Sequence, residues 1–409
     1  LRRAYFRVII QGIRAMLRGL GSMNIRCRQA QWQTRRGALM ILALVLLILL
    51  LAFLAFAVDI GFVSTTKGQL QNAADAAALS AAIELRDGIG VGASKTTAEV
   101  AALARAEAVR IAGVHRNGDV QSTFANGSRD VRLGRRVWNP TTGAWVDTWG
   151  TGPYNLLEVT LHRQRSDNKA LPLFFAPLLG QRDIEVSAKS VTVLEPGVGF
   201  RVVPGSCGNA KVLPIAIDLG TWNNLLGGGG SDNLTYNPVT GAVSVGSDGL
   251  RECNLYPTGS TTLPAGNRGT VDVGNPANTT ADLKRQILYG LDATDLSFYT
   301  DNELRTDSGP LYLTGDTGLS AGVQSELLQI VGQVRAIPVF VEVSGPGYQA
   351  TYTVVKFVGV RILAVRLYGS PAQKYLKVQP ALFVDCTVIR GGNVAIADDS
   401  VFSPARLTN

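Results

Sequence analysis

Histidine and cysteine are scarce in this chain, whose 409 residues include two histidines and four cysteines. His115 and His162 lie far in sequence from any nucleophile or carboxylate pair, so neither a zinc site nor a catalytic triad is expected. The turn at residues 204–208 (PGSCG) lacks the G-x-S-x-G spacing of a nucleophile elbow. P-loop, dinucleotide-binding and EF-hand spacings are missing as well. We therefore expect no enzyme activity and no cofactor.

Candidate metal ligands are also few in the sequence. Asp232, Asp248 and Asp272 lie in glycine-rich loops and could ligate calcium. Scattered loop aspartates more often form turns or face solvent, because their short side chains hydrogen-bond to nearby backbone. The sequence predicts no metal site.

An excess of positive charge is missing from most of the chain, although the formal net charge is +8. Nine arginines precede the first apolar run; removing them from the 39 basic residues leaves 30, against 31 acidic ones. The body is therefore neutral and lacks the electrostatic footprint of a nucleic-acid-binding protein. Basic flanks stay in the cytoplasm, so the N-terminus is expected inside. These arginines are Arg2, Arg3, Arg7, Arg14, Arg18, Arg26, Arg28, Arg35 and Arg36.

What the chain does have is a long apolar run. Residues 38–58 are 21 apolar residues without a charge. A run of this length crosses a hydrocarbon core of about 30 Å, whereas the apolar region of a removable signal is shorter and ends in a cleavage site. We expect a signal anchor: a single-pass protein held in membrane lipid, with its C-terminal body exported to the far side.

The segment before this run is less defined. Residues 3–20 can form a helix with arginines on one face and apolar residues on the other, as in a membrane-surface helix. Alternatively the segment is untranslated or disordered, since Leu1 opens the sequence and Met23 is a credible start.

A helical pattern continues past the membrane. Residues 38–86 contain no proline and would form a helix of about 73 Å, more than twice what a bilayer requires. The projecting part carries rows of alanine that permit close helix approach. We expect a helix assembly face that includes Asp59, Asn72, Asp75, Ala77 and Ala81.

The polar members of this face allow two interpretations each. Asp59 either pairs with a partner's amine or arginine, or lies exposed among the lipid headgroups. Asn72 and Asp75 either set the register between helices or face water.

The rest of the chain predicts an α+β fold with mainly antiparallel strands. A helix is expected at residues 96–114, and a hairpin at 130–138 and 144–149 around the turn NPTTG. A similar turn, NPVTG, starts at Asn237. Further strands are expected at 155–162 and 184–194, with a short apolar helix or loop at 170–179 between them.

Glu195-Pro196-Gly197 is the expected boundary to a second exported α+β domain with Gly/Asn-rich loops. In it we expect helices at 280–289 and 320–334, and strands at 336–343, 350–367 and 377–388, with a bend near Gly359. The expected organisation is a basic cytoplasmic tail (1–36), a transmembrane helix (37–58), an α+β domain that continues the long helix (59–195) and the second domain (196–409).

Three cysteines lie beyond the apolar run, which permits one disulfide. Cys207 and Cys253 both lie in Gly/Asn-rich loops and form the preferred pair. Cys386 lies in a strand-like apolar pattern (LFVDCTVI), where a buried free thiol is common. Other pairings stay open.

The N-terminal helix also carries a recognisable pattern. The segments RRGA (35–38), AVDIG (57–61) and LQNAADAAALSAA (70–82) resemble the N-terminal domain of TadE/TadG-like proteins of the Tad (Flp-type) pilus system. Weaker similarity extends through residues 172–180 and 186–193. The resemblance implies a non-enzymatic, envelope-anchored, pilin-like component that acts in pilus assembly or surface attachment, with other pilus-assembly or pilin-like proteins as partners through the helix.

Two features depart from related proteins. The metal-binding D-x-S-x-S motif of larger relatives is missing, so metal-dependent adhesion is not implied. Cleavage after Gly37 would place Leu42 where type IV pilins have glutamate, which argues against prepilin processing and for retention in the membrane.

One alternative function remains. Trp138, Trp145, Trp149 and Trp222 could stack on the sugars of a surface polymer, which would make the body a glycan-binding module on a membrane anchor.

Overall fold

The computed structural model describes residues 36–90, 92–256, 269–275, 279–315, 321–345, 350–391, 399 and 401–408. The predicted helix at 3–20, most of the basic tail and Cys27 lie outside these residues. The chain forms two units, residues 1–58 and 59–409, and the expected α+β class is confirmed.

Helix α2 (Arg36–Glu84) contains the apolar run and continues for 26 residues from Asp59 to Glu84. Its first part is long and apolar enough to cross a membrane, and none of its most apolar window is buried within the chain. This exposure suits a segment whose side chains face lipid. One apolar N-terminal helix thus fits a single-pass membrane anchor.

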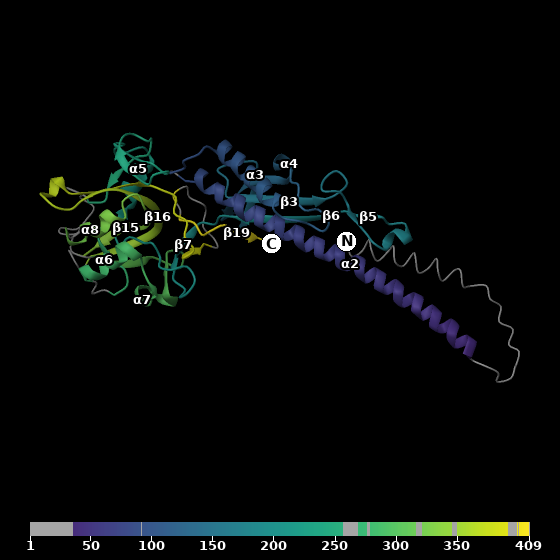
Figure 1. The fold of residues 1–409 in the computed structure, drawn as a ribbon. Helices are drawn as coiled ribbons and strands as arrows, with labels where there is room; N and C mark the ends of the chain where they lie inside the picture. The colour runs from purple at the N-terminus through teal and green to yellow at the C-terminus, as the bar shows by residue number, and fades with distance from the viewer. Residues whose placement is uncertain are drawn as a thin grey trace. The chain divides into compact units, whose positions relative to one another are not determined.

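Within residues 59–409, α2 packs with helix α3 (Thr97–Gly113) on a five-stranded antiparallel sheet (Figure 1). A capping box starts α3, because Thr96 accepts from the Glu99 backbone and Glu99 accepts from Thr96. The strand order is β19-β6-β3-β1-β2. The bounds are β1 Val131–Asn139, β2 Ala144–Trp149, β3 Leu156–Arg163, β6 Val186–Val193 and β19 Arg406–Thr408, with η1 Leu85–Gly88, α4 Gly127–Asp130, β4 Leu171–Pro172, η2 Ala176–Leu179 and β5 Asp183–Ile184 between them.

The two predicted turns share one geometry. Asn139 Oδ1 accepts hydrogen bonds from the backbone N–H groups two and three residues further along the chain, and Asn237 Oδ1 does the same. Each turn is closed by its glycine, whose N–H donates to the backbone carbonyl of the asparagine. The two glycines have positive φ, 62° for Gly143 and 72° for Gly241. The repeated sequence therefore encodes a repeated turn, as its residue types predict.

A larger mixed sheet dominates the second half. Strand β16 (Thr351–Arg366) pairs with β15 (Val334–Ser344), β14 (Leu311–Gly315) and β17 (Tyr375–Pro380), all antiparallel, whereas β8 (Ile217–Asp218) runs parallel to β15. The remaining elements are β7 Gly197–Arg201, α5 Leu219–Leu226, β9 Leu234–Tyr236, β10 Val243–Val245, β11 Cys253–Asn254, β12 Val271–Asp272, α6 Thr280–Tyr289, α7 Ala293–Leu296, η3 Thr300–Asn302, β13 Glu303–Arg305, η4 Ala321–Val323, α8 Gln324–Gln329, η6 Pro371–Gln373 and β18 Val388–Arg390.

Three predictions about these elements need correction. The predicted bend does not lie at Gly359 itself, which pairs regularly inside β16 and where a Cβ would come within 2.2 Å of the Ala381 carbonyl. The register of β16 shifts instead on either side of it, at Val355 and at Leu363. The predicted strand at 377–388 stops at Pro380 and resumes as β18 at Val388. The helix predicted at 320–334 is formed by η4 and α8 and ends at Gln329, where a turn leads into β15.

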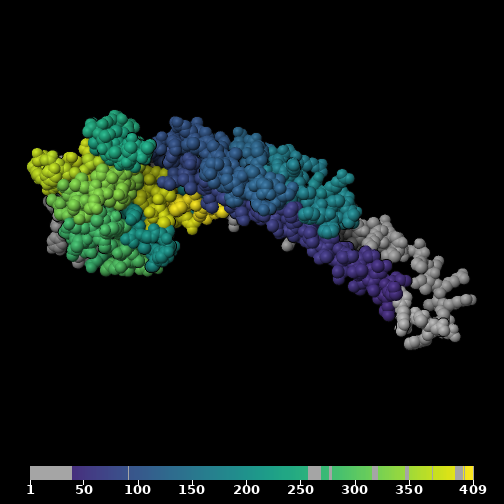
Figure 2. Space-filling view, viewed as in Figure 1, coloured from purple at the N-terminus to yellow at the C-terminus, as the bar shows by residue number. Residues whose placement is uncertain are grey.

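The expected boundary at Glu195 is crossed by the end of the chain. Strand β19 pairs with β6, and Phe402 lies buried in the core beneath the first sheet. Arg406 donates to both carboxylate oxygens of Glu195 at 2.8 and 2.7 Å. Figure 2 shows the yellow C-terminal residues alongside the blue first half. The C-terminus therefore completes the sheet formed by residues 131–193.

The expected disulfide is wrong. Cys207 bonds to Cys386, with the two Cα atoms 5.9 Å apart, and Cys253 is a free thiol. The prediction that Cys386 is a buried thiol in a strand is wrong as well. Asp385 accepts hydrogen bonds from the Thr387 backbone N–H and hydroxyl, so the chain turns here and Cys386 is exposed. Cys253 instead lies in β11, where burial raises the pKa of its thiol to about 12.

Candidate functional site

The alanines of the expected assembly face lie inside the chain's own core. Ala77 and Ala81 have no exposed surface and pack in one cluster with alanines of α3 and with Leu157 and Val159 of β3. Small side chains allow this close approach of helix and sheet. A partner helix could reach Ala77 or Ala81 only if this packing opened.

The polar members of that face do not join them. Asn72 is exposed, and Asp75 is half-buried and accepts from Gln71 Nε2 at 2.8 Å. The same Gln71 amide also donates to the Lys189 carbonyl of β6 at 3.0 Å. The structure thus separates the five predicted residues, and an assembly role for Asn72 or Asp75 stays a prediction.

Asp59 is neither exposed nor available to a partner. Only 3% of its surface is exposed, and its carboxylate accepts hydrogen bonds from three successive backbone N–H groups. Phe174 donates to Oδ1 at 2.8 Å, Ala176 donates to Oδ2 at 2.7 Å, and Phe175 donates to both oxygens at 3.3 and 3.1 Å. Three converging amides form a concave anion site, and here its occupant is a side chain of α2. We call this arrangement the Asp59 clamp.

The clamp holds a loop of defined geometry, residues 173–180. Leu171 and Leu173 are buried at its base, where β4 pairs with β5. Pro177 lies in the short helix η2, and Gly180 ends it with φ 88°, a value that favours glycine. In Figure 1 the segment around β5 lies at one end of the five-stranded sheet.

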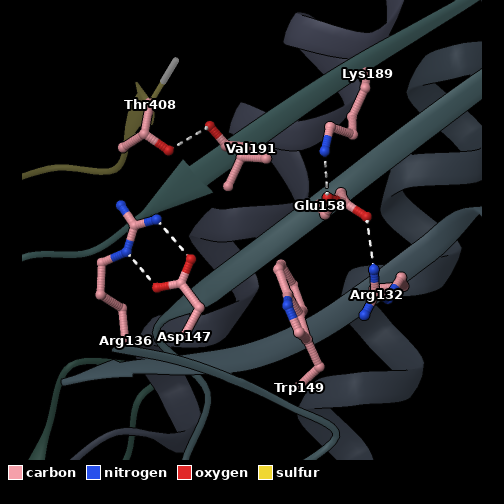
Figure 3. A pocket seen from close by; sticks show the side chains of 8 residues that line it. All are labelled: Arg132, Arg136, Asp147, Trp149, Glu158, Lys189, Val191 and Thr408. Atoms are coloured by element: carbon pink, nitrogen blue, oxygen red, sulfur yellow. Dashed lines mark hydrogen bonds and ion pairs between the residues drawn. The ribbon is translucent and has the colours of Figure 1, made fainter. Parts of the chain in front are cut away.

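A second candidate site is a hollow of about 480 Å³ on the sheet, lined by charged residues (Figure 3). The nearly buried Glu158 of β3 lies between two cations, Arg132 of β1 at 3.2 Å and Lys189 of β6 at 3.1 Å. Arg136 makes two hydrogen bonds of 2.6 and 2.7 Å to Asp147 across the hairpin, and this carboxylate raises the pKa of the guanidinium. Trp149, Val191 and Thr408 complete the lining.

This hollow gives the glycan interpretation little support. The ring of Trp149 is covered by the Arg132 guanidinium, 4.5 Å from its centroid, so that face is occupied within the chain. Trp138 and Trp145 pack edge to face at 5.5 Å. Trp222 is 1% exposed and donates to Asp399 Oδ2 at 2.7 Å, so the expectation that it is free to stack on a sugar is wrong.

The residues considered for catalysis or metal binding have structural roles. Ser206 Oγ donates to the Val203 carbonyl of its own turn, and His162 Nε2 lies 3.9 Å from Asp130. Asp232 accepts from Ser247, Asp248 and Gly249 and so links two loops of the chain. Across the described ranges, no group of three or more His, Cys, Asp or Glu side chains is placed to hold a metal.

The clamp and the ion pairs of the hollow were not predicted from the sequence. The sequence does mark the loop itself, since the apolar stretch 170–179 follows a polar loop. No sequence signal pairs it with Asp59, which lies 115 residues earlier than Phe174.

Comparison with known proteins identifies the N-terminal segment. Residues 37–84 match the family model described as putative Flp pilus-assembly TadE/G-like. No curated protein and no solved structure matches the chain. The matched range runs from Gly37, directly before the apolar run, to Glu84, the last residue of α2. The chain therefore carries a TadE/G-like pilus-assembly domain at residues 37–84, which supports a pilus-related role.

Proposed function

We propose that this chain is a non-enzymatic, membrane-anchored, pilin-like component of a Tad/Flp-type pilus system, acting in pilus assembly or surface attachment. The observation that carries the proposal is one uninterrupted helix, α2, which joins an apolar run of membrane-spanning length to an alanine-rich segment. The family match covers the same residues.

The orientation we propose places the N-terminus in the cytoplasm and the body outside the cytoplasmic membrane. The nine arginines before the apolar run favour it through the positive-inside rule. The bond between Cys207 and Cys386 supports it independently, because disulfides persist in oxidising compartments such as the periplasm.

A structural role suits the buried polar groups of the body. Arg163, fully buried, donates to Asn117, Asp119 and the Lys169 carbonyl. Such bonds fix loops in place and leave the buried guanidinium satisfied. The body would then present a rigid surface to other pilus components.

The test is deletion of the gene in its own bacterium, with complementation by the full chain. Surface pili and attachment are expected to be lost and then restored. Intact mass and N-terminal sequence, from membranes and from sheared surface material, separate the two roles. A start at Ala38 in the sheared fraction identifies a processed subunit, whereas an uncleaved chain in membranes identifies an anchored assembly or attachment factor.

Normal pili and normal attachment in the deletion strain would contradict the proposal. If that strain instead lost only binding to an isolated surface polymer, the glycan-binding alternative would replace it. Trp149→Ala would then be the variant to examine, since Trp149 lines the hollow on the sheet.

A further inference from the structure

Four large apolar side chains stand exposed together on the loop that the Asp59 clamp holds. The exposed fractions are 63% for Phe174, 42% for Phe175, 85% for Leu178 and 89% for Leu179. Single exposed apolar residues are common on protein surfaces, but a contiguous group marks an interaction site. We call these four residues the loop tip.

The loop tip is held in place by its surroundings. The clamp fixes the backbone of residues 174–176 on Asp59, and the Phe174 ring lies 5.1 Å from the ring of Phe62 in the next turn of α2. Leu173 is buried, and its N–H donates to the Arg182 carbonyl at 3.1 Å. Apolar side chains on a fixed backbone lose little further entropy on binding, which favours a permanent contact.

The position of the clamp along the chain indicates which surface the tip meets. Asp59 directly follows Val58, the last residue of the apolar run. When that run fills the hydrocarbon core, Asp59 lies where the core ends. The hydrogen bonds of 2.7–3.3 Å to Asp59 then hold the loop at this level of the membrane.

We propose that the loop tip inserts into the interfacial layer of the lipid bilayer on the exported side, so that the body is seated on the membrane at a second point beside its anchor. The inference rests on the membrane anchor of the proposed function. Phenylalanine and leucine are side chains that interfacial segments bury among acyl chains. Arg182 is exposed just after the loop and suits the lipid phosphates.

The test is lipid quenching of an environment-sensitive fluorophore on the full chain. The purified protein is reconstituted into phosphatidylethanolamine/phosphatidylglycerol vesicles with nitroxide-labelled lipid. The probe is attached to Leu178→Cys, in a Cys27→Ser background. The Cys27→Ser chain without an introduced cysteine measures any labelling of the half-buried Cys253. Val239→Cys is the matched control, since Val239 is apolar and 92% exposed at the tip of another turn. Leu47→Cys reports on the anchor.

Nitroxide lipid is expected to quench the Leu178 probe several-fold more than the Val239 probe. If the Leu47 probe is quenched but the Leu178 probe behaves like Val239, the inference is overturned and the anchor stands. If the Leu47 probe is not quenched either, the anchor of the proposed function is wrong. A Leu178 probe that is open to water in vesicles but shielded in native membranes identifies a protein partner and also overturns the inference.

The clamp is tested in the same vesicles. Asp59→Asn replaces one acceptor oxygen by an N–H donor that faces backbone amides. The loop then loses hydrogen bonds that hold it on α2, and quenching at Leu178 is expected to fall. Asp75→Asn, on the same helix, is the matched control. Unchanged quenching in Asp59→Asn overturns the role assigned to the clamp.

Discussion

Alanine in α2 has a packing role that its small size explains. Six alanines between Ala73 and Ala82 have no exposed surface and lie against α3 and the first sheet. A helix lined with alanine can approach a sheet more closely than one lined with leucine, and interiors packed this closely leave no room for added atoms. The six residues are Ala73, Ala74, Ala77, Ala78, Ala81 and Ala82.

Substituting one of these alanines should therefore cost stability. We expect Ala77→Leu to lower the free energy of unfolding by about 1–3 kcal/mol, because overpacking forces strained rotamers or backbone shifts. Chemical denaturation of the full chain in detergent, followed by circular dichroism, measures this. Ala106→Leu is the control: Ala106 is exposed on α3, and its variant should stay within about 0.5 kcal/mol of wild type. Equal stability of both variants would show that Ala77 faces outward, as an assembly face requires.

At the scale of elements, one carboxylate ties α2 to α3. Glu107 of α3 accepts from Ser80 Oγ of α2 at 2.5 Å and from two nitrogens of Arg110 at 2.7 Å. The pKa of Glu107 falls from an ordinary value of 4.5 to about 2, chiefly because of the hydrogen bonds from Arg110 and secondly because of the one from Ser80. The tie therefore depends on the ionised form of Glu107.

This shift predicts a pH dependence with a defined sign. A carboxyl whose pKa is lower in the folded state stabilises the fold above its unfolded pKa and loses that contribution as pH falls toward the folded value. Glu107→Gln should thus be less stable than wild type by about 1 kcal/mol at pH 7, with the difference shrinking between pH 4.5 and pH 2.

Denaturation of the full chain at pH 7, 4 and 3 measures that difference. Glu342→Gln, at an exposed glutamate of β15, is the control and should match wild type at each pH. A Glu107→Gln effect that stayed constant down to pH 3 would mean that the carboxylate charge does not hold the two helices together.

Local elements could be predicted from the sequence, whereas their pairing could not. Helix α6 coincides with the prediction, and both asparagine turns form, because caps and turn residues act over four or five positions. The partners of Asp59, Cys207 and β19 lie more than 100 residues away from them. Local patterns carry no information about such contacts, which depend on the packing of the whole chain.

At the scale of the whole molecule, the end of the chain closes the first sheet. Strand β19 covers the edge of β6, which would otherwise present unpaired backbone groups. The ion pair between Arg406 and Glu195 reinforces this closure, since only 8% of the Glu195 side chain is exposed. Residues 59–193 thus pack with residues 402–408, from the far end of the sequence.

Deleting residues 405–409 should therefore destabilise the first half of the body. We expect a loss of about 2 kcal/mol, because the truncated chain leaves a nearly buried carboxylate without its bidentate partner and a strand edge without its neighbour. Limited proteolysis with mass spectrometry is the measurement, and new cleavages should concentrate around β6. Arg390→Ala is the control: Arg390 also approaches Glu195, at 3.8 Å, but it leaves β19 in place. If the truncated chain and the Arg390→Ala variant were digested alike, the sheet of residues 131–193 would be stable without β19.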